Sequence, residues 1–142
     1  MAMEKLVSLD LSDIQFLVVD DNEFVRRLVF EILVSFGARY VQQATSAEEA
    51  LAAMKRREPD LIITDWVMPG LTGLDLLRSL RGGGGATRIP VIVLSGHATS
   101  DYVSQALGEG ADSYIVKPFS PQTVMDHLLK VIAHSDKATA YV

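Results

Sequence analysis

The chain has 142 residues, of which 49% are hydrophobic and 22% charged, a size and composition that suit one globular domain and exclude a chain disordered throughout. It contains no cysteine, which excludes a disulfide framework, a thiolate zinc site and cysteine catalysis. Its formal net charge of −5 argues against sequence-independent binding to nucleic acid, which needs a positive surface facing the phosphates.

Five short apolar runs, rich in β-branched residues, predict strands. In chain order they cover residues 14–19, 40–44, 60–64, 90–94 and 113–116. The second run is the weakest of the five, and the others are nearly continuous rather than alternating. Continuous apolar runs are typical of strands that are covered on both faces.

Helical patterns separate these runs, at residues 23–36, 46–57, 73–81, 99–108 and 120–134. The first should bury one apolar face and end at Gly37 as its C-cap. That face consists of Val25, Leu28, Val29, Ile32, Leu33 and Phe36. The second opens with the capping box Ser46-Ala47-Glu48-Glu49 and should bury Ala47, Ala50, Leu51 and Met54. On the last, Val124 and Leu128 fit the core face, while Met125, Leu129 and Ile132 widen the apolar arc.

Strand and helix alternate five times, which predicts an α/β fold: a doubly wound, five-stranded parallel sheet with five helices on both faces. The domain should span residues 14–134, between an N-terminal extension, 1–13, and a C-terminal tail, 135–142. The run Gly82-Gly83-Gly84-Gly85 lacks the Lys-Ser/Thr of a phosphate-binding loop and predicts a mobile loop.

No apolar run approaches the ~18 residues that a membrane helix requires. The first residues, Met1 to Val7, lack the basic stretch and apolar core of a secretory signal. We therefore expect a soluble, cytoplasmic protein with no membrane partner and no direct nucleic-acid partner.

Polar residues follow four of the five predicted strands. Asp20 and Asp21 come after the first, Asp65 after the third, Ser95 after the fourth and Lys117 after the fifth. In open parallel sheets the functional crevice lies outside the carboxyl ends of the strands. Each residue alone has an ordinary structural explanation, such as a turn or a helix cap, but their convergence on one edge is specific. Three close carboxylates suit Mg²⁺, and the ammonium and hydroxyl groups suit a phosphoryl group held beside it.

The chain resembles the receiver domain of bacterial response regulators over about residues 13–134. The matching pieces are Asp20-Asp21, Asp65 with Met68-Pro69-Gly70 and Gly73, Ser95, Tyr114, and Lys117-Pro118-Phe119. The resemblance implies a flavodoxin-like receiver fold with strand order 2-1-3-4-5. It also implies a module of two-component or phosphorelay signalling, which is not an enzyme beyond its own phosphorylation and dephosphorylation. About eight residues follow residue 134, too few for an output domain, so we expect a stand-alone receiver.

Residue roles follow from the same resemblance. Asp65 would accept the phosphoryl group, and Asp20, Asp21, Asp65 and the backbone carbonyl of Val67 would hold Mg²⁺, with Mn²⁺ possible. Lys117 would pair with the phosphoryl group, and its bond to Pro118 would be cis. Ser95 and Tyr114 would form the switch. Phe119 would anchor the turn in the core.

The implied phosphoryl donor is a sensor histidine kinase or a histidine phosphotransfer protein. A downstream protein target would bind the face formed by the helix 99–108, the strand 113–116 and the helix 120–134. The protein would be a monomer or a phosphorylation-linked dimer. Two residues that flank the phosphoryl group in this family, Val67 and His97 here, would tune its hydrolysis, and we expect that hydrolysis to be slow.

Three alternatives remain open at the level of the sequence. Asp65 could be the nucleophile of a magnesium-dependent phosphatase, although Val67 stands where such enzymes often place a general acid. The chain could be the receiver fragment of a longer regulator with an output domain. A degenerate receiver that serves only as a scaffold is disfavoured, because the acceptor and the metal ligands are all present.

Overall fold

The computed structural model describes residues 10–82 and 88–133. Within these ranges the chain forms one sheet of five parallel strands in the order β2-β1-β3-β4-β5, which confirms the predicted fold. The strands are β1 (Gln15–Val19), β2 (Tyr40–Ala44), β3 (Leu61–Asp65), β4 (Val91–Ser95) and β5 (Ser113–Val116). The helices are α2 (Glu23–Ser35), α3 (Ala47–Arg56), α4 (Gly73–Gly82), α5 (Ser100–Gly108) and α6 (Pro121–Ala133).

Several expectations concern segments outside the described residues. These are most of the N-terminal extension, residues 1–9, the glycines 83–85 of the predicted loop, and the tail 135–142. The first glycine of that run, Gly82, is the last residue of α4. None of the helices in the described part of the chain is long and apolar enough to cross a membrane.

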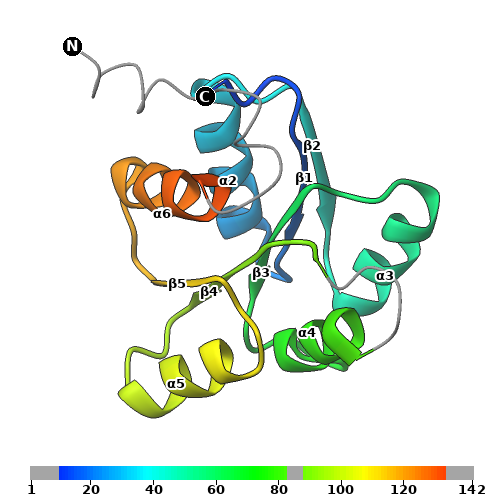
Figure 1. The fold of residues 1–142 in the computed structure, drawn as a ribbon, viewed down its shortest axis with the longest axis vertical. Coiled ribbons are helices and arrows are strands. Elements are labelled where there is room, and N and C mark those ends of the chain that lie inside the picture. Colours follow the sequence, from blue (N-terminus) through cyan, green and yellow to red (C-terminus); the bar gives the residue numbers. More distant parts are fainter. Residues whose placement is uncertain (1–9, 83–87, 134–142) are drawn as a thin grey trace.

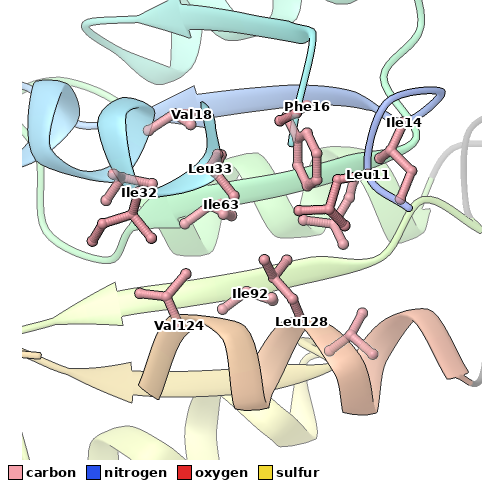
Figure 2. Packing of buried hydrophobic residues seen from close by; sticks show 14 of the residues in the cluster. Leu11, Ile14, Phe16, Val18, Ile32, Leu33, Ile63, Ile92, Val124 and Leu128 are labelled. Carbon is pink, nitrogen blue, oxygen red and sulfur yellow. The ribbon is translucent and has the colours of Figure 1, made fainter. Parts of the chain in front are cut away.

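The helices form two layers, with α2 and α6 on one face of the sheet and α3, α4 and α5 on the other (Figure 1). Alternate strand residues point to the two layers because side chains in a strand alternate between its faces. Figure 2 shows the α2/α6 side, where Phe16, Val18, Ile63 and Ile92 of the sheet meet Ile32, Leu33, Val124 and Leu128 of the helices. This two-sided burial explains why the strands read as continuous apolar runs.

Helix α2 confirms most of its predicted buried face but not Phe36. Val29, Ile32 and Leu33 are buried, and Val25 and Leu28 pack against the core, whereas Phe36 is 36% exposed. The helix ends at Ser35, and the chain turns through Phe36 and Gly37, whose φ is +104°. This turn places the Phe36 ring outside the buried face of α2. Ala38 is the next buried residue.

The remaining helix predictions agree closely with the structure. Ser46 caps α3 by accepting a hydrogen bond from the Glu49 N–H at 3.1 Å. In α6, Val124, Leu128 and Ile132 are buried, and Met125 packs against the core. The wide apolar arc of α6 is therefore mainly a consequence of burial.

Candidate functional site

The carboxyl ends of the strands bring the predicted site residues to one edge of the sheet. Asp20 directly follows β1, and Lys117 directly follows β5. Asp65 and Ser95 are the last residues of β3 and β4 rather than the first residues beyond them. The parallel register places Asp65 beside Leu94 and Ser95 beside Val116. The sheet alone thus assembles the site from segments far apart in the sequence.

Three carboxylates form the acidic part of the site. Asp20 is fully buried, Asp65 is 8% exposed and Asp21 is exposed. One ligand oxygen from each of the three residues lies within 4.8 Å of the other two. This set of hard oxygen ligands, open to solvent at Asp21, fits a divalent cation such as Mg²⁺.

The electrostatics of Asp65 support a cation at this position. Burial raises the pKa of its carboxyl group, and the negative charge of Asp20 raises it further. The Lys117 ammonium and the N–H of Trp66 act in the opposite direction, but the net pKa is raised. An added positive charge would therefore stabilise the ionised carboxylate.

Lys117 supplies the ammonium group of the site. Its Nζ lies 3.0 Å from Oδ2 of Asp20 and 3.4 Å from Oδ1 of Asp65. The peptide bond from Lys117 to Pro118 is cis, as predicted. Phe119 is half-buried and packs against the core. Lys117 follows β5, which lies across β4 from β3 and β1, and its ammonium group still reaches the two most buried carboxylates.

Backbone N–H groups hold the two buried carboxylates. The Asn22 N–H donates to Oδ1 of Asp20 at 2.9 Å, and the Trp66 N–H donates to Oδ1 of Asp65 at 2.8 Å. In the described part of the chain, no buried side-chain nitrogen or oxygen lacks a hydrogen-bond partner. Asp20 and Asp65 are fixed before any ligand arrives.

The loop after Asp65 approaches α4 very closely. A Cβ atom built on Gly73 would lie 2.3 Å from the Asp65 carbonyl oxygen, so this position requires glycine. Gly70 has a φ of +78°. In the loop between the end of β3 and Gly70, Trp66 and Met68 are buried, whereas Val67 is 52% exposed. The loop therefore exposes the Val67 side chain to solvent two residues after Asp65.

A chain of contacts connects Ser95 with Tyr114 through His97. The His97 N–H donates to the Ser95 hydroxyl at 3.1 Å, and the Tyr114 hydroxyl donates to the His97 carbonyl at 2.7 Å. The exposed His97 ring stacks on Tyr102 of α5, with 4.3 Å between ring centroids. The two predicted switch residues are thus coupled through the backbone of His97.

Two residues of this region were not singled out in the sequence. Tyr102 stacks on His97, and Arg26 of α2 donates from Nη1 to the Asp20 carbonyl at 2.9 Å. No sequence signal identifies either contact, because each depends on how a long side chain lies between neighbouring elements.

The comparison with protein families decides what kind of site this is. Residues 16–129 match the family model "Response regulator receiver domain". The chain belongs to the response regulator receiver family. The receiver identity agrees with the acidic pocket of Asp20, Asp21 and Asp65, which is typical of phosphoaccepting receivers.

Curated relatives and solved structures support the assignment. The receiver is 34% identical over 119 residues to "Chemotaxis protein CheY-3" of Vibrio cholerae, covering 84% of this chain and 92% of that protein. It is 32% identical over 117 residues to "Chemotaxis protein CheY" of Pseudomonas aeruginosa, covering 82% and 94%.

Among solved structures, CheY4 of Vibrio cholerae has a TM-score of 0.77 at 30% identity, with 83% and 98% of the chains covered. A response regulator receiver domain protein of Clostridium thermocellum has a TM-score of 0.75 at 30% identity, with 84% and 94% covered. The receiver is therefore CheY-like, a signalling module and not a conventional enzyme. Membership of this family implies a histidine kinase partner. The phosphatase alternative is set aside.

Proposed function

We propose that Asp65 accepts a phosphoryl group from a phosphohistidine of a sensor histidine kinase or a histidine phosphotransfer protein. One observation carries the proposal: the Asp65 carboxylate lies both in the acidic cluster and beside the Lys117 ammonium. Within residues 10–82 and 88–133, the contacts of Asp65 with Trp66 and Lys117 both use Oδ1. Oδ2 is the oxygen left to attack.

The proposed reaction forms a bond from Oδ2 of Asp65 to phosphorus and breaks the bond from phosphorus to the imidazole nitrogen of the donor. The bonding electrons and a solvent proton go to the leaving imidazole. Asp20, Asp21, Asp65 and the Val67 backbone carbonyl would hold Mg²⁺, or Mn²⁺ in its place. When bound, the ion supplies charge neutralisation at the phosphoryl oxygens. Lys117 would pair with one of these oxygens and so stabilise the developing charge.

The proposed readout starts at Ser95. A phosphoryl group adds roughly −1.5 to −2 charges and new acceptor oxygens, so the Ser95 hydroxyl would turn toward it and lose its bond from the His97 N–H. Tyr114 is tied to the His97 carbonyl and would move in response. The contact chain described above supports this coupling.

The face formed by α5, β5 and α6 is the proposed docking site for a downstream protein. Exposed apolar side chains on α5 and β5 support this: Tyr102, Leu107 and Val116 are 37%, 46% and 37% exposed. Tyr102 also lines a surface hollow with Asp101 and Gln105. The protein would act as a monomer or as a phosphorylation-linked dimer. The cytoplasmic location stays a prediction from the sequence.

Intact mass after incubation with acetyl phosphate and Mg²⁺ tests the proposed chemistry. We expect the wild type to gain one phosphoryl group, with no gain in Asp65→Asn or without Mg²⁺. A gain that persists in Asp65→Asn contradicts the proposal. If the folded wild type gains nothing from acetyl phosphate or from a phosphorylated histidine kinase, the proposal is also wrong.

A further inference from the structure

Arg26 connects three elements behind the acidic cluster. It lies in the first turns of α2 and is half-buried as a residue. Nη1 donates to the Asp20 carbonyl oxygen at 2.9 Å, and Nε donates to Oε1 of Gln43 on β2 at 3.1 Å. The guanidinium fork therefore fixes the end of β1 against both α2 and β2.

All the polar groups of Asp20 are held in this arrangement. Its N–H donates to the Ala44 carbonyl at 3.1 Å, and its two carboxylate oxygens accept from the Asn22 N–H and from Lys117. The carbonyl oxygen, which belongs to the peptide bond between Asp20 and Asp21, is held by Arg26. Arg26 thus sets the orientation of the peptide plane from which Asp21 begins.

Asp21 differs from the other two carboxylates. It is exposed, and no contact within the described residues fixes its side chain, although one of its oxygens lies within 4.8 Å of both Asp20 and Asp65. Its backbone is therefore the main control on its direction. We propose that Arg26 is a positioning residue, which holds the Asp20–Asp21 peptide so that the Asp21 carboxylate faces the metal site. This inference rests on the proposed function.

A positioning role and a purely electrostatic role of Arg26 predict opposite changes in Mg²⁺ affinity when Arg26 is replaced. A guanidinium near a dication repels it, so removing the charge alone should tighten Mg²⁺ binding. Removing a group that orients a metal ligand should weaken binding, typically by tenfold or more. Arg26→Lys keeps the charge but loses the fork that spans Asp20 and Gln43. Positioning therefore predicts weaker binding in Arg26→Lys as well as in Arg26→Gln.

Trp66 provides a binding signal that does not depend on phosphorylation. It is the only tryptophan, and it directly follows Asp65, to which its backbone N–H donates, so its fluorescence should report Mg²⁺ at the site. Titrations of the wild type, Arg26→Lys, Arg26→Gln and Gln43→Ala test the inference. Arg27→Gln is the matched control, because it removes the same charge from an exposed position one residue along α2. Thermal unfolding without Mg²⁺ establishes that each variant is folded.

We expect the Kd for Mg²⁺ to rise about tenfold in Arg26→Lys. It should rise less in Arg26→Gln, where loss of the repelling charge partly offsets the lost positioning, and less in Gln43→Ala. It should stay level or fall in Arg27→Gln. The phosphorylation rate at saturating Mg²⁺ should stay near that of the wild type in the control Arg27→Gln. A wild-type Kd in Arg26→Lys, or tighter binding in Arg26→Gln, overturns the positioning role and leaves the proposed function intact. A wild type that binds no Mg²⁺ overturns both. If Arg26→Gln does not fold, Arg26→Lys and Gln43→Ala still decide the question.

Discussion

The ammonium group of Lys117 lies closer to Asp20 than to Asp65, at 3.0 Å against 3.4 Å. Asp20 is fully buried, whereas Asp65 is 8% exposed. An isolated buried carboxylate is costly, and a directly paired cation offsets much of that cost. In the absence of a phosphoryl group, Lys117 therefore mainly stabilises the Asp20 carboxylate while remaining within reach of the proposed acceptor.

Lys117→Gln should separate metal binding from phosphoryl transfer. The change removes a cation that repels Mg²⁺, so Mg²⁺ affinity should be at least that of the wild type. Phosphorylation by acetyl phosphate at saturating Mg²⁺ should slow by about 100-fold, because one preorganised electrostatic stabiliser is lost. The control is Lys130→Gln on the exposed side of α6. A Lys117→Gln rate close to that of the wild type contradicts the role.

Gly73→Ala should destabilise the protein at the site itself. The new Cβ would lie 2.3 Å from the Asp65 carbonyl oxygen and 2.9 Å from Cα of Trp66. The free energy of unfolding in urea should fall by about 1–3 kcal/mol, as for other overpacked positions. Gly82→Ala in the same helix meets no atom within 4 Å and should leave stability unchanged or slightly higher. Equal stabilities of the two variants would disprove the close-approach argument.

The phosphoryl group on Asp65 should persist for many minutes. The Val67 side chain, two residues after Asp65 and 52% exposed, can neither donate nor accept a hydrogen bond to orient an attacking water. The other residue expected to tune hydrolysis is His97, and its ring stacks on Tyr102. Decay followed by intact mass should be slow in the wild type and faster in Val67→Asn. Leu71→Asn, on an exposed apolar residue of the same loop, should decay at the wild-type rate. A wild-type half-life of seconds would be incompatible with this account.

The contact between β5 and α6 should make stability depend on pH through His127. The Ser113 hydroxyl is hydrogen-bonded to Nδ1 of His127. Burial lowers the pKa of His127, the charge of Lys130 lowers it further, and Asp126 opposes both. The unfolded state therefore binds the proton more readily, and this stabilisation is present above the ordinary His pKa of about 6.5 and lost as the pH falls through the lowered value.

Urea unfolding of the wild type and His127→Gln at a series of pH values measures this effect. The variant cannot titrate at this position, so the stability of the wild type relative to it should decrease as the pH falls from about 7.5 to about 5.5. A difference that stays constant over this range would show that His127 does not titrate differently in the two states.

The sequence could predict the sheet and the convergence of the site residues, because both depend on where the strands lie and where they end. Parallel strands align their carboxyl ends, so Asp20, Asp65, Ser95 and Lys117 had to converge once the five runs were recognised. The error at Phe36 arose where the helix ended, since a helical periodicity predicts burial only as far as the helix continues.

Contacts of long side chains could not be predicted in the same way. The preference of Lys117 for Asp20, the stack of His97 on Tyr102 and the bridge from Arg26 to Gln43 each depend on a rotamer that reaches between elements. Periodicity places a residue on a face, but it does not fix where the end of a flexible side chain lies.

The most direct test of the account is the location of the phosphoryl group. The protein would be phosphorylated with acetyl phosphate and Mg²⁺, reduced with borohydride and digested for tandem mass spectrometry. Borohydride converts an aspartyl phosphate into homoserine with release of phosphate. We predict homoserine at position 65 alone, dependent on Mg²⁺ and absent in Asp65→Asn. Homoserine at position 20 or 21, or phosphate retained on another residue with Asp65 unchanged, would contradict the assignment of Asp65 as the acceptor.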